Sequence, residues 1–133
     1  MSLVTLVVDD VARSRAFYVD GRGWTAEFDG GDEVLMFRLG EHLLLSLWNR
    51  EHAAREIGEV AAGVTAPVTL AHNVATTEEV DRILALARDA GSPLVSEAVA
   101  RGWGGYSGYF SDPDGFRWEI AVNPTPLGNS LLP

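Results

Sequence analysis

The chain has 133 residues, of which 47% are hydrophobic and 22% are charged, a composition typical of one compact domain. Its formal net charge of −9 argues against a nucleic-acid partner, because binding to a phosphate backbone needs a basic patch. No apolar run reaches the roughly 20 residues of a membrane-spanning helix. The N-terminal MSLVTLVVDD also lacks the basic segment of a signal peptide. We therefore expect a cytoplasmic protein that has no membrane partner.

The residue inventory excludes two kinds of covalent chemistry. There are no cysteines, which rules out disulfides, thiol nucleophiles and thiolate metal ligands. The 10 basic residues are all arginine, which rules out Schiff-base chemistry on a lysine. The excess of acidic residues either attracts a cationic ligand or only aids solubility.

The first half of the chain predicts a strand, a helix and three more strands. Residues 3–9, LVTLVVD, form an apolar run of strand length. The segment DDVARSRAFYVDGRGW has the pattern of a helix that begins after Asp9 or Asp10 and ends at Gly21 and Gly23. Turn signals at DGGD and GE then separate three short strands, at residues 24–28, 33–39 and 42–48.

The second half repeats this order. A strand at residues 68–74 leads to a helix with a capping box formed by Thr76 and Glu79, and this helix ends at Gly91. The remaining strands are predicted at residues 93–99, 106–111 and 116–122, with the tight turn DPDG between the last two. The tail PTPLGNSLLP is predicted to be irregular.

Each half is thus a βαβββ module, and the two modules align with each other. Leu3 aligns with Thr69 at an offset of 66 residues, and Asn49 aligns with Asn123 at an offset of 74 residues. A half of this size is too small to bury its sheet face alone, so we expect a single domain built from both. Its parts are module 1 at residues 1–49, a linker with a short helix at 50–67, module 2 at 68–123 and a tail at 124–133.

Two stretches, VTLVVDDVARSRAFYVDGRGW and GYFSDPDGFRWEIA, resemble the vicinal oxygen chelate superfamily. This group comprises glyoxalases, bleomycin resistance proteins and extradiol dioxygenases, and the resemblance covers nearly the whole chain. It implies an α+β fold in which two βαβββ modules form a partly open mixed β-barrel with helices outside. It also implies a small-molecule ligand inside the barrel and a homodimer.

Metal-dependent members of that superfamily hold a divalent metal with His and Glu side chains on the first and last strands of each module. The resemblance maps these four positions onto Leu3, Leu45, Thr69 and Glu119. Leucine cannot bind a metal and a neutral threonine is a poor ligand, whereas a stable site needs about three or more protein ligands. We therefore expect no metal and no other cofactor, and Glu119 is the only retained ligand position.

His72, in the strand TLAHNV, is the histidine that could add a ligand. Strand alternation places Thr69 on one face and His72 on the other, where His72 would pack and form hydrogen bonds between helix and sheet. A bulge would reverse this parity and bring His72 to the ligand side. His42 and His52 are expected to be solvated.

The same alternation predicts the lining of the cavity. The first half supplies an apolar wall and the second half supplies the polar groups, which is typical of a pocket with an apolar body and a few orienting groups. The predicted lining consists of Leu3, Thr5, Val7, Leu43, Leu45, Leu47, Thr69, Ala71, Asn73, Arg117, Glu119 and Ala121.

Glu119 has three interpretations: an internal salt bridge with Arg117, a ligand-binding group, or a surface acid. A buried carboxylate needs a partner, and Thr69 or Asn73 could also donate a hydrogen bond to it. Aromatic side chains are predicted to line the mouth of the pocket or else to pack in the core or a dimer contact. These aromatic residues are Trp48, Trp103, Tyr106 and Tyr109.

These features favour a protein that binds a small apolar or amphipathic molecule, with antibiotic sequestration as one form of that function. Three alternatives stay open. The first is a metal-dependent lyase, isomerase or dioxygenase with an unorthodox site. The second is a metal-free acid–base enzyme that uses Glu119. The third is a structural or regulatory dimer with a collapsed cavity.

Overall fold

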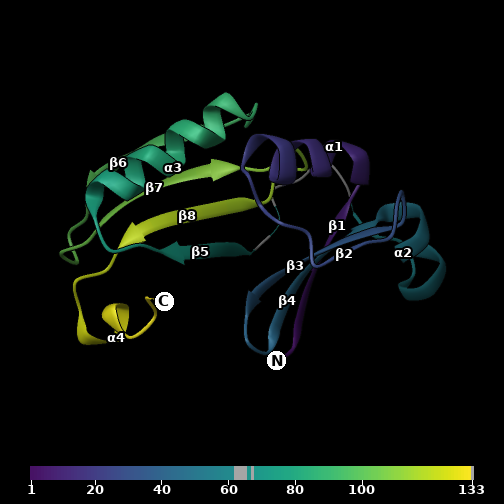
Figure 1. Cartoon of the computed structure of the whole chain (residues 1–133), viewed down its shortest axis with the longest axis horizontal. Coiled ribbons are helices and arrows are strands. Elements are labelled where there is room, and N and C mark those ends of the chain that lie inside the picture. The colour runs from purple at the N-terminus through teal and green to yellow at the C-terminus, as the bar shows by residue number, and fades with distance from the viewer. Residues whose placement is uncertain (62–65, 67, 133) are drawn as a thin grey trace. The chain divides into compact units, whose positions relative to one another are not determined.

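The computed structural model describes residues 1–61, 66 and 68–132. The chain divides into two compact units, Met1–Val64 and Thr65–Pro133, and each holds one four-stranded sheet (Figure 1). None of the helices in the described ranges is long and apolar enough to cross a membrane.

The first unit contains a mixed sheet with the strand order β1-β4-β3-β2. β1 runs parallel to β4, and the other neighbouring strands are antiparallel. The elements are β1 (Leu3–Val8), α1 (Val11–Arg15), the π-helix η1 (Ala16–Gly21), β2 (Phe28–Asp29), β3 (Val34–Gly40), β4 (Leu43–Asn49) and α2 (Arg50–Ile57). The short helix predicted in the linker is therefore present as α2. Residues 62–65 and 67 of that linker lie outside the described residues.

The first helix begins after Asp10, one of the two predicted caps. Its carboxylate accepts the backbone N–H of Arg13 at 3.1 Å, which satisfies a donor that has no partner within the helix. The chain winds as α1 and then continues as η1, so that Phe17 and Tyr18 are both buried. Gly23, just beyond the end of η1, has φ of +73°, a conformation that favours glycine.

Aromatic rings fill the core of the first unit. The ring centroid of Tyr18 lies 5.2 Å from that of Trp24 and 5.6 Å from that of Phe37. Trp24 and Phe37 meet edge to face at 5.2 Å, a favourable aromatic geometry. The strand predicted at residues 24–28 is wrong: Trp24 packs into this cluster, and β2 is confined to Phe28 and Asp29.

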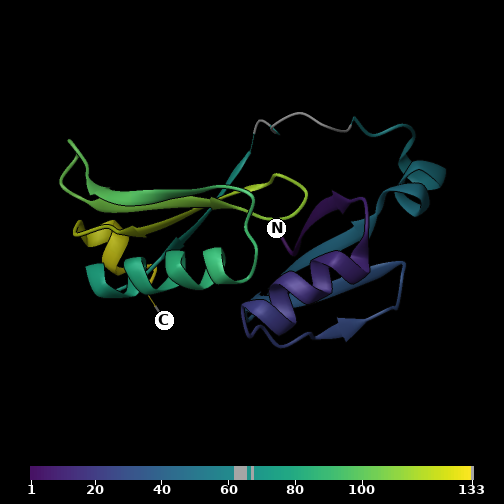
Figure 2. The same ribbon diagram turned by 90° about the horizontal axis from the view of Figure 1, so that it is seen from above.

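The second unit repeats the design with the strand order β5-β8-β7-β6, in which β5 is parallel to β8. Its elements are β5 (Thr69–Asn73), α3 (Thr77–Asp89), β6 (Val95–Ala100), β7 (Tyr106–Ser111), β8 (Arg117–Val122) and α4 (Pro126–Asn129). Two views show α3 lying along one face of this sheet (Figure 1, Figure 2). The predicted α+β class and the two βαβββ units are thus confirmed.

The helix α3 is fixed by its cap and by its apolar face. The Thr76 hydroxyl accepts the N–H of Glu79, and the Glu79 carboxylate accepts the N–H of Thr76, which is the predicted capping box. Gly108 on β7 permits close packing, since a Cβ atom there would lie 2.5 Å from Cδ1 of Leu84. The buried face of the helix consists of Val80, Ile83, Leu84 and Ala87. On the sheet side of this core, the rings of Phe110 and Trp118 stack at 6.1 Å with an interplanar angle of 4°.

The DPDG turn between β7 and β8 is organised by Asp112. This buried carboxylate accepts the backbone N–H groups of Asp114 at 3.0 Å and of Phe116 at 2.9 Å. Gly115 has φ of +89° and donates its N–H to the Asp112 carbonyl. Because this one side chain accepts two backbone N–H groups of the turn, it fixes the point at which β8 begins.

The tail differs from the prediction. It was expected to be irregular, but residues Pro126–Asn129 form the one-turn helix α4. The Thr125 hydroxyl accepts the N–H of Gly128 at 3.1 Å, and a proline follows at the first helical position. The cap and the proline were both visible in the sequence. Pro133 lies outside the described residues.

Candidate functional site

Three strands of the second unit place polar side chains on one face. Residues paired across neighbouring strands share a face, and successive residues of a strand alternate between faces. Gly108 contacts Leu84 of α3 and pairs with Ile120, so these residues mark the helix-covered face. The opposite face, here called the far face, carries the rows Thr69–Arg117–Ser111, Ala71–Glu119–Tyr109 and Asn73–Ala121–Ser107. The common face predicted for the second-half residues is therefore confirmed.

Glu119 is half-buried at the centre of the far face. The phenol of Tyr109, its cross-strand neighbour on β7, donates a hydrogen bond to Oε1 of Glu119 at 2.7 Å. The sequence suggested Arg117 as the ion-pair partner, but no ion pair joins Arg117 and Glu119 among the described residues. Adjacent strands bring opposed side chains closer than two positions along one strand do, which explains why Tyr109 is the partner.

Arg101 is a member of this cluster that the sequence analysis missed. Its guanidinium donates from Nε to the Ser107 hydroxyl at 3.0 Å and from a terminal nitrogen to the Ser107 carbonyl at 2.9 Å. The same guanidinium lies 5.6 Å from the centroid of the Tyr109 ring. A cation over an aromatic face is attracted to it. Strand alternation places Ser107 on the same face as Tyr109, and this was the sequence signal for the part of the face that Arg101 contacts.

The pKa of the Tyr109 phenol is raised above its ordinary value of about 10. The main cause is the hydrogen bond to Glu119, which holds the phenolic proton, and burial and the negative charge of Glu119 act in the same direction. The positive charge of Arg101 and a hydrogen bond with Ser107 lower the pKa in part. Near neutral pH, Tyr109 is therefore a donor that holds Glu119 in position.

Trp103 lies in the loop between β6 and β7 and is 52% exposed. Its indole covers Gly105, where a Cβ atom would lie 1.8 Å from the ring. Backbone hydrogen bonds from Arg101 to the Gly105 carbonyl and from Gly104 to the Arg101 carbonyl close the loop. The loop thus fixes the backbone from which the Arg101 side chain reaches Ser107.

Tyr106 does not join Tyr109. The two residues are an odd number of positions apart, so their rings lie on opposite faces of β7. The Tyr106 phenol donates to the carboxylate of Asp81 on α3 at 2.8 Å. Tyr106 therefore links the sheet to the helix.

His72 lies on the helix-covered side of the sheet, paired with Ile120, as alternation predicted. No bulge interrupts the pairing of β5 with β8. Its side chain is exposed, however, so the expected packed position between helix and sheet is wrong. The reason is that β5 is an edge strand, whereas α3 packs on β6, β7 and β8.

In the first unit the predicted lining on β4 is wrong by one residue. Leu45 pairs with Phe37, which packs on Tyr18, so Leu45 is fully buried on the helix-covered face rather than beside Leu3. The far face of this unit, opposite Tyr18, instead consists on β1 and β4 of Leu3, Thr5, Val7, Leu44, Ser46 and Trp48. Its predominantly apolar character agrees with the predicted contrast between the two halves.

The error comes from the internal alignment. Matching Asn49 with Asn123 gave an offset of 74, but Asn49 is the last residue of β4 whereas Asn123 follows the end of β8. Strand pairing gives 73, because Leu3 pairs with Leu44 while its equivalent Thr69 pairs with Arg117. Ser46 is therefore the counterpart of Glu119.

The corrected positions do not fit a divalent metal. They are Leu3, Ser46, Thr69 and Glu119, each on the far face of its own unit. One carboxylate, two neutral hydroxyls and an alkyl chain fall short of the three or more His or acidic ligands that such a site needs. Among the described residues, no group of three or more His, Asp and Glu side chains is placed to hold a metal ion.

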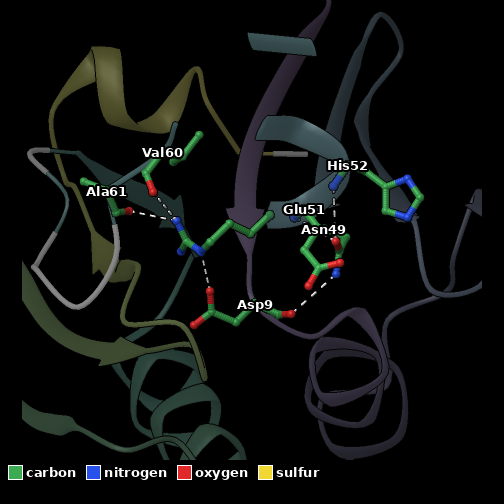
Figure 3. Close-up of polar contacts among 7 residues, drawn as sticks. Asp9, Asn49, Glu51, His52, Val60 and Ala61 are labelled. Atoms are coloured by element: carbon green, nitrogen blue, oxygen red, sulfur yellow. Dashed lines mark hydrogen bonds and ion pairs between the residues drawn. The ribbon is translucent and has the colours of Figure 1, made fainter. Parts of the chain in front are cut away.

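A second polar cluster lies at the ends of β1 and β4 in the first unit (Figure 3). Nε of Arg50 lies 2.5 Å from the Asp9 carboxylate, and NH1 of Arg50 donates to the carbonyls of Val60 at 2.8 Å and Ala61 at 2.9 Å. Asn49 caps the first turn of α2 through its side-chain oxygen. This cluster ties the end of β1 to the segment after α2, and we assign it a structural role.

The model of the glyoxalase/bleomycin resistance protein/dioxygenase superfamily matches residues 1–120 of the chain. None of the curated proteins matches it. Among solved structures, a glyoxalase-related enzyme from Fulvimarina pelagi is 32% identical, with 93% of this chain and 88% of that chain covered and a TM-score of 0.84.

Two more distant structures show the fold alone. A glyoxalase/bleomycin resistance protein/dioxygenase from Nocardioides is 22% identical, with 91% of this chain and 81% of that chain covered and a TM-score of 0.75. A lactoylglutathione lyase from Agrobacterium tumefaciens is 22% identical, with 92% of each chain covered and a TM-score of 0.72. Since the family model spans nearly all of the sequence, the chain belongs to the glyoxalase/bleomycin resistance protein/dioxygenase superfamily.

Proposed function

We propose that the protein binds a small apolar or amphipathic molecule on the far face of the second unit, without a catalytic metal. Glu119 and Tyr109 orient the polar part of the ligand, and antibiotic sequestration is one form of this function. The observation that carries the proposal is the 2.7 Å hydrogen bond from Tyr109 to Glu119 on a sheet face that α3 does not cover. A preorganised pair of this kind keeps the cost of ordering side chains on binding low.

The far face also offers surface for an apolar ligand body. Val99 on β6 pairs with Ser107, which places it on the far face, and it is 48% exposed. The Tyr109 ring and Ala71 lie in the neighbouring row. A few polar groups set among such surface are typical of small-molecule sites. Asn73, on this same face, is a further proposed ligand contact.

A thermal-shift screen with antibiotics and aromatic metabolites tests the proposal, because a ligand stabilises the state that it binds. Each hit is then titrated calorimetrically against the wild type and against Glu119→Gln, which keeps the shape of the side chain and removes its charge. We expect the variant to bind about tenfold or more weakly, as for loss of a charge-assisted hydrogen bond.

The matched control is Glu78→Gln, an exposed acid on α3. It should bind as the wild type does. A screen in which nothing raises the melting temperature, or a Glu119→Gln variant with unchanged affinity, would contradict the proposal. The metal-free part is tested by elemental analysis of protein purified without chelator: about one equivalent of a transition metal would overturn it, and less than about a tenth would support it.

A second candidate function is a metal-free acid–base enzyme in which Glu119 is the base. Tyr109 engages only Oε1 of Glu119, and Oε2 forms no hydrogen bond with the described residues. Such an oxygen can accept a proton from a bound substrate and return it. Mass spectrometry of each screening hit after incubation with the protein in D2O distinguishes the two functions, because a proton that Glu119 removes and returns is replaced by deuterium. Turnover that Glu119→Gln abolishes supports the enzyme, and recovery of the unchanged ligand supports binding alone.

A further inference from the structure

In one row of the far face, every residue has a side chain that can donate a hydrogen bond to an anion. Arg117 on β8 pairs with Thr69 on β5 and with Ser111 on β7, so a guanidinium lies between two hydroxyl residues. Opposed side chains on neighbouring strands have their Cβ atoms about 5 Å apart. Ser111 is buried, whereas Thr69 is exposed and Arg117 is half-buried, so Arg117 and Thr69 are the two groups that can reach one small ligand group together. The fork of an arginine and nearby hydroxyls match the oxygens of a carboxylate or sulfonate.

The charge of Arg117 is not neutralised within the described part of the chain. Arg117 is half-buried as a residue, and its guanidinium has no ion pair and no hydrogen bond with any described residue. The nearest acid on the same strand face, Glu119, accepts the phenol of Tyr109 instead. In the adjoining turn, the Asp112 carboxylate accepts two backbone N–H groups. The chain has 19 acidic and 10 basic residues, yet no carboxylate in its described ranges pairs with Arg117, so the charge of Arg117 is left for a ligand.

We propose that Arg117 and Thr69, in the row Thr69–Arg117–Ser111, here called the anion row, bind the negatively charged oxygens of an organic acid ligand. The inference rests on the proposed small-molecule binding and names the chemical class of the ligand. Glu119 and Tyr109, in the next row, then contact a hydroxyl or other donor of the same molecule. The net charge of −9 favours a cationic ligand at long range, but the local charge of the anion row selects an anion at contact distance.

Two fluorescent probes that differ in a single charged group test this assignment. 1-Anilinonaphthalene-8-sulfonate carries a sulfonate, and N-phenyl-1-naphthylamine is the same molecule without it. Both are titrated into the wild type, Arg117→Gln and Arg117→Lys. We expect Arg117→Gln to weaken binding of the sulfonate probe about tenfold or more and to leave the neutral probe unchanged. Arg117→Lys should give an intermediate loss, because it keeps the charge but not the fork.

The control is Arg82→Gln, an exposed arginine of α3, which should change neither affinity. Thr69→Val gives a second test if Arg117→Gln fails to fold, and it should weaken only the sulfonate probe. Equal losses for both probes, or no loss for either, would overturn the anion row while leaving small-molecule binding intact. If neither probe binds the wild type and the ligand screen is also negative, the proposed function fails together with the inference.

Discussion

Glu119 is held by a neighbour that was not recognised from the sequence. Arg117 lies two positions before Glu119 on β8, and that spacing predicted a salt bridge between the two side chains. The partner is Tyr109, directly across the ladder, and the guanidinium of Arg101 covers the ring of this tyrosine. At this scale, alternation along a strand could be predicted from the sequence, whereas cross-strand pairing depends on a register that local patterns do not encode.

The titration of Tyr109 gives a prediction at this scale. The pKa of its phenol is raised chiefly by the hydrogen bond to Glu119, so it should ionise above pH 10 in the folded protein. Glu119→Gln should bring the pKa back toward its ordinary value, because the carboxylate charge is lost. Absorbance at about 295 nm during alkaline titration, with Tyr109→Phe to assign the signal, measures this shift.

The same shift links Tyr109 to stability. The pKa of Tyr109 is higher in the folded state than in the unfolded state. Its contribution to the free energy of unfolding is therefore fully present below about pH 10 and is lost as the pH rises through the folded-state pKa. Tyr109→Phe should therefore flatten this alkaline decline. A wild type and a Glu119→Gln variant with the same Tyr109 titration would contradict the assigned cause.

The elements follow the sequence where local chemistry decides them. The capping box at Thr76 and the bounds of β7 agree with the predictions because a cap and a strand between glycine-rich turns are short-range features. The strand predicted at residues 24–28 was wrong because Trp24 packs against Tyr18 and Phe37 in the aromatic core. The predicted alignment of β4 was wrong by one residue because it matched Asn49 with Asn123, which do not occupy equivalent positions in the two sheets.

Gly108 gives a prediction at the element scale. A Cβ atom there would lie 2.5 Å from Leu84 Cδ1, 2.8 Å from the Ser96 carbonyl and 2.9 Å from the Ala98 nitrogen. Gly108→Ala should therefore push α3 or β6 away from β7 and lower the free energy of unfolding by about 1–3 kcal/mol. Urea denaturation measures this change.

Gly102→Ala is the control for that substitution. Gly102 lies in the loop before the same strand, its φ is not positive, and a Cβ atom there meets nothing within 4 Å. Its unfolding free energy should stay within about 0.5 kcal/mol of the wild type. Equal stability of the two variants would show that α3 does not depend on a glycine at position 108.

At the scale of the whole molecule, each unit has one sheet face that its main helix covers and one that it does not. The far face of the first unit is largely apolar, with Leu3, Val7 and Leu44 among its side chains, whereas that of the second unit carries the polar rows. The contrast was predictable from alternation despite the slipped register on β4. The sequence also predicted that only one of the four mapped metal-ligand positions holds a carboxylate. This stays true when Ser46 replaces Leu45 at the second position.

Self-association is the prediction at this scale. Extended apolar surface on a sheet is stabilised when another layer covers it, and a second copy of the chain supplies such a layer. We therefore expect a homodimer, with a mass by sedimentation equilibrium twice that of one chain across micromolar concentrations. Dilution should shift the equilibrium toward the single chain by mass action. A single-chain mass at every concentration would rule this out.

The two aromatic clusters make the units separately visible to spectroscopy. Trp24 sits edge-on to Phe37 in the first unit, and Trp118 stacks in parallel on Phe110 in the second. Rings held rigidly in asymmetric surroundings give near-ultraviolet circular dichroism, which vanishes when specific packing is lost. Replacing Trp24 or Trp118 by phenylalanine in turn would assign the bands. The order in which the two units melt could then be recorded from the intact chain, without attaching a dye.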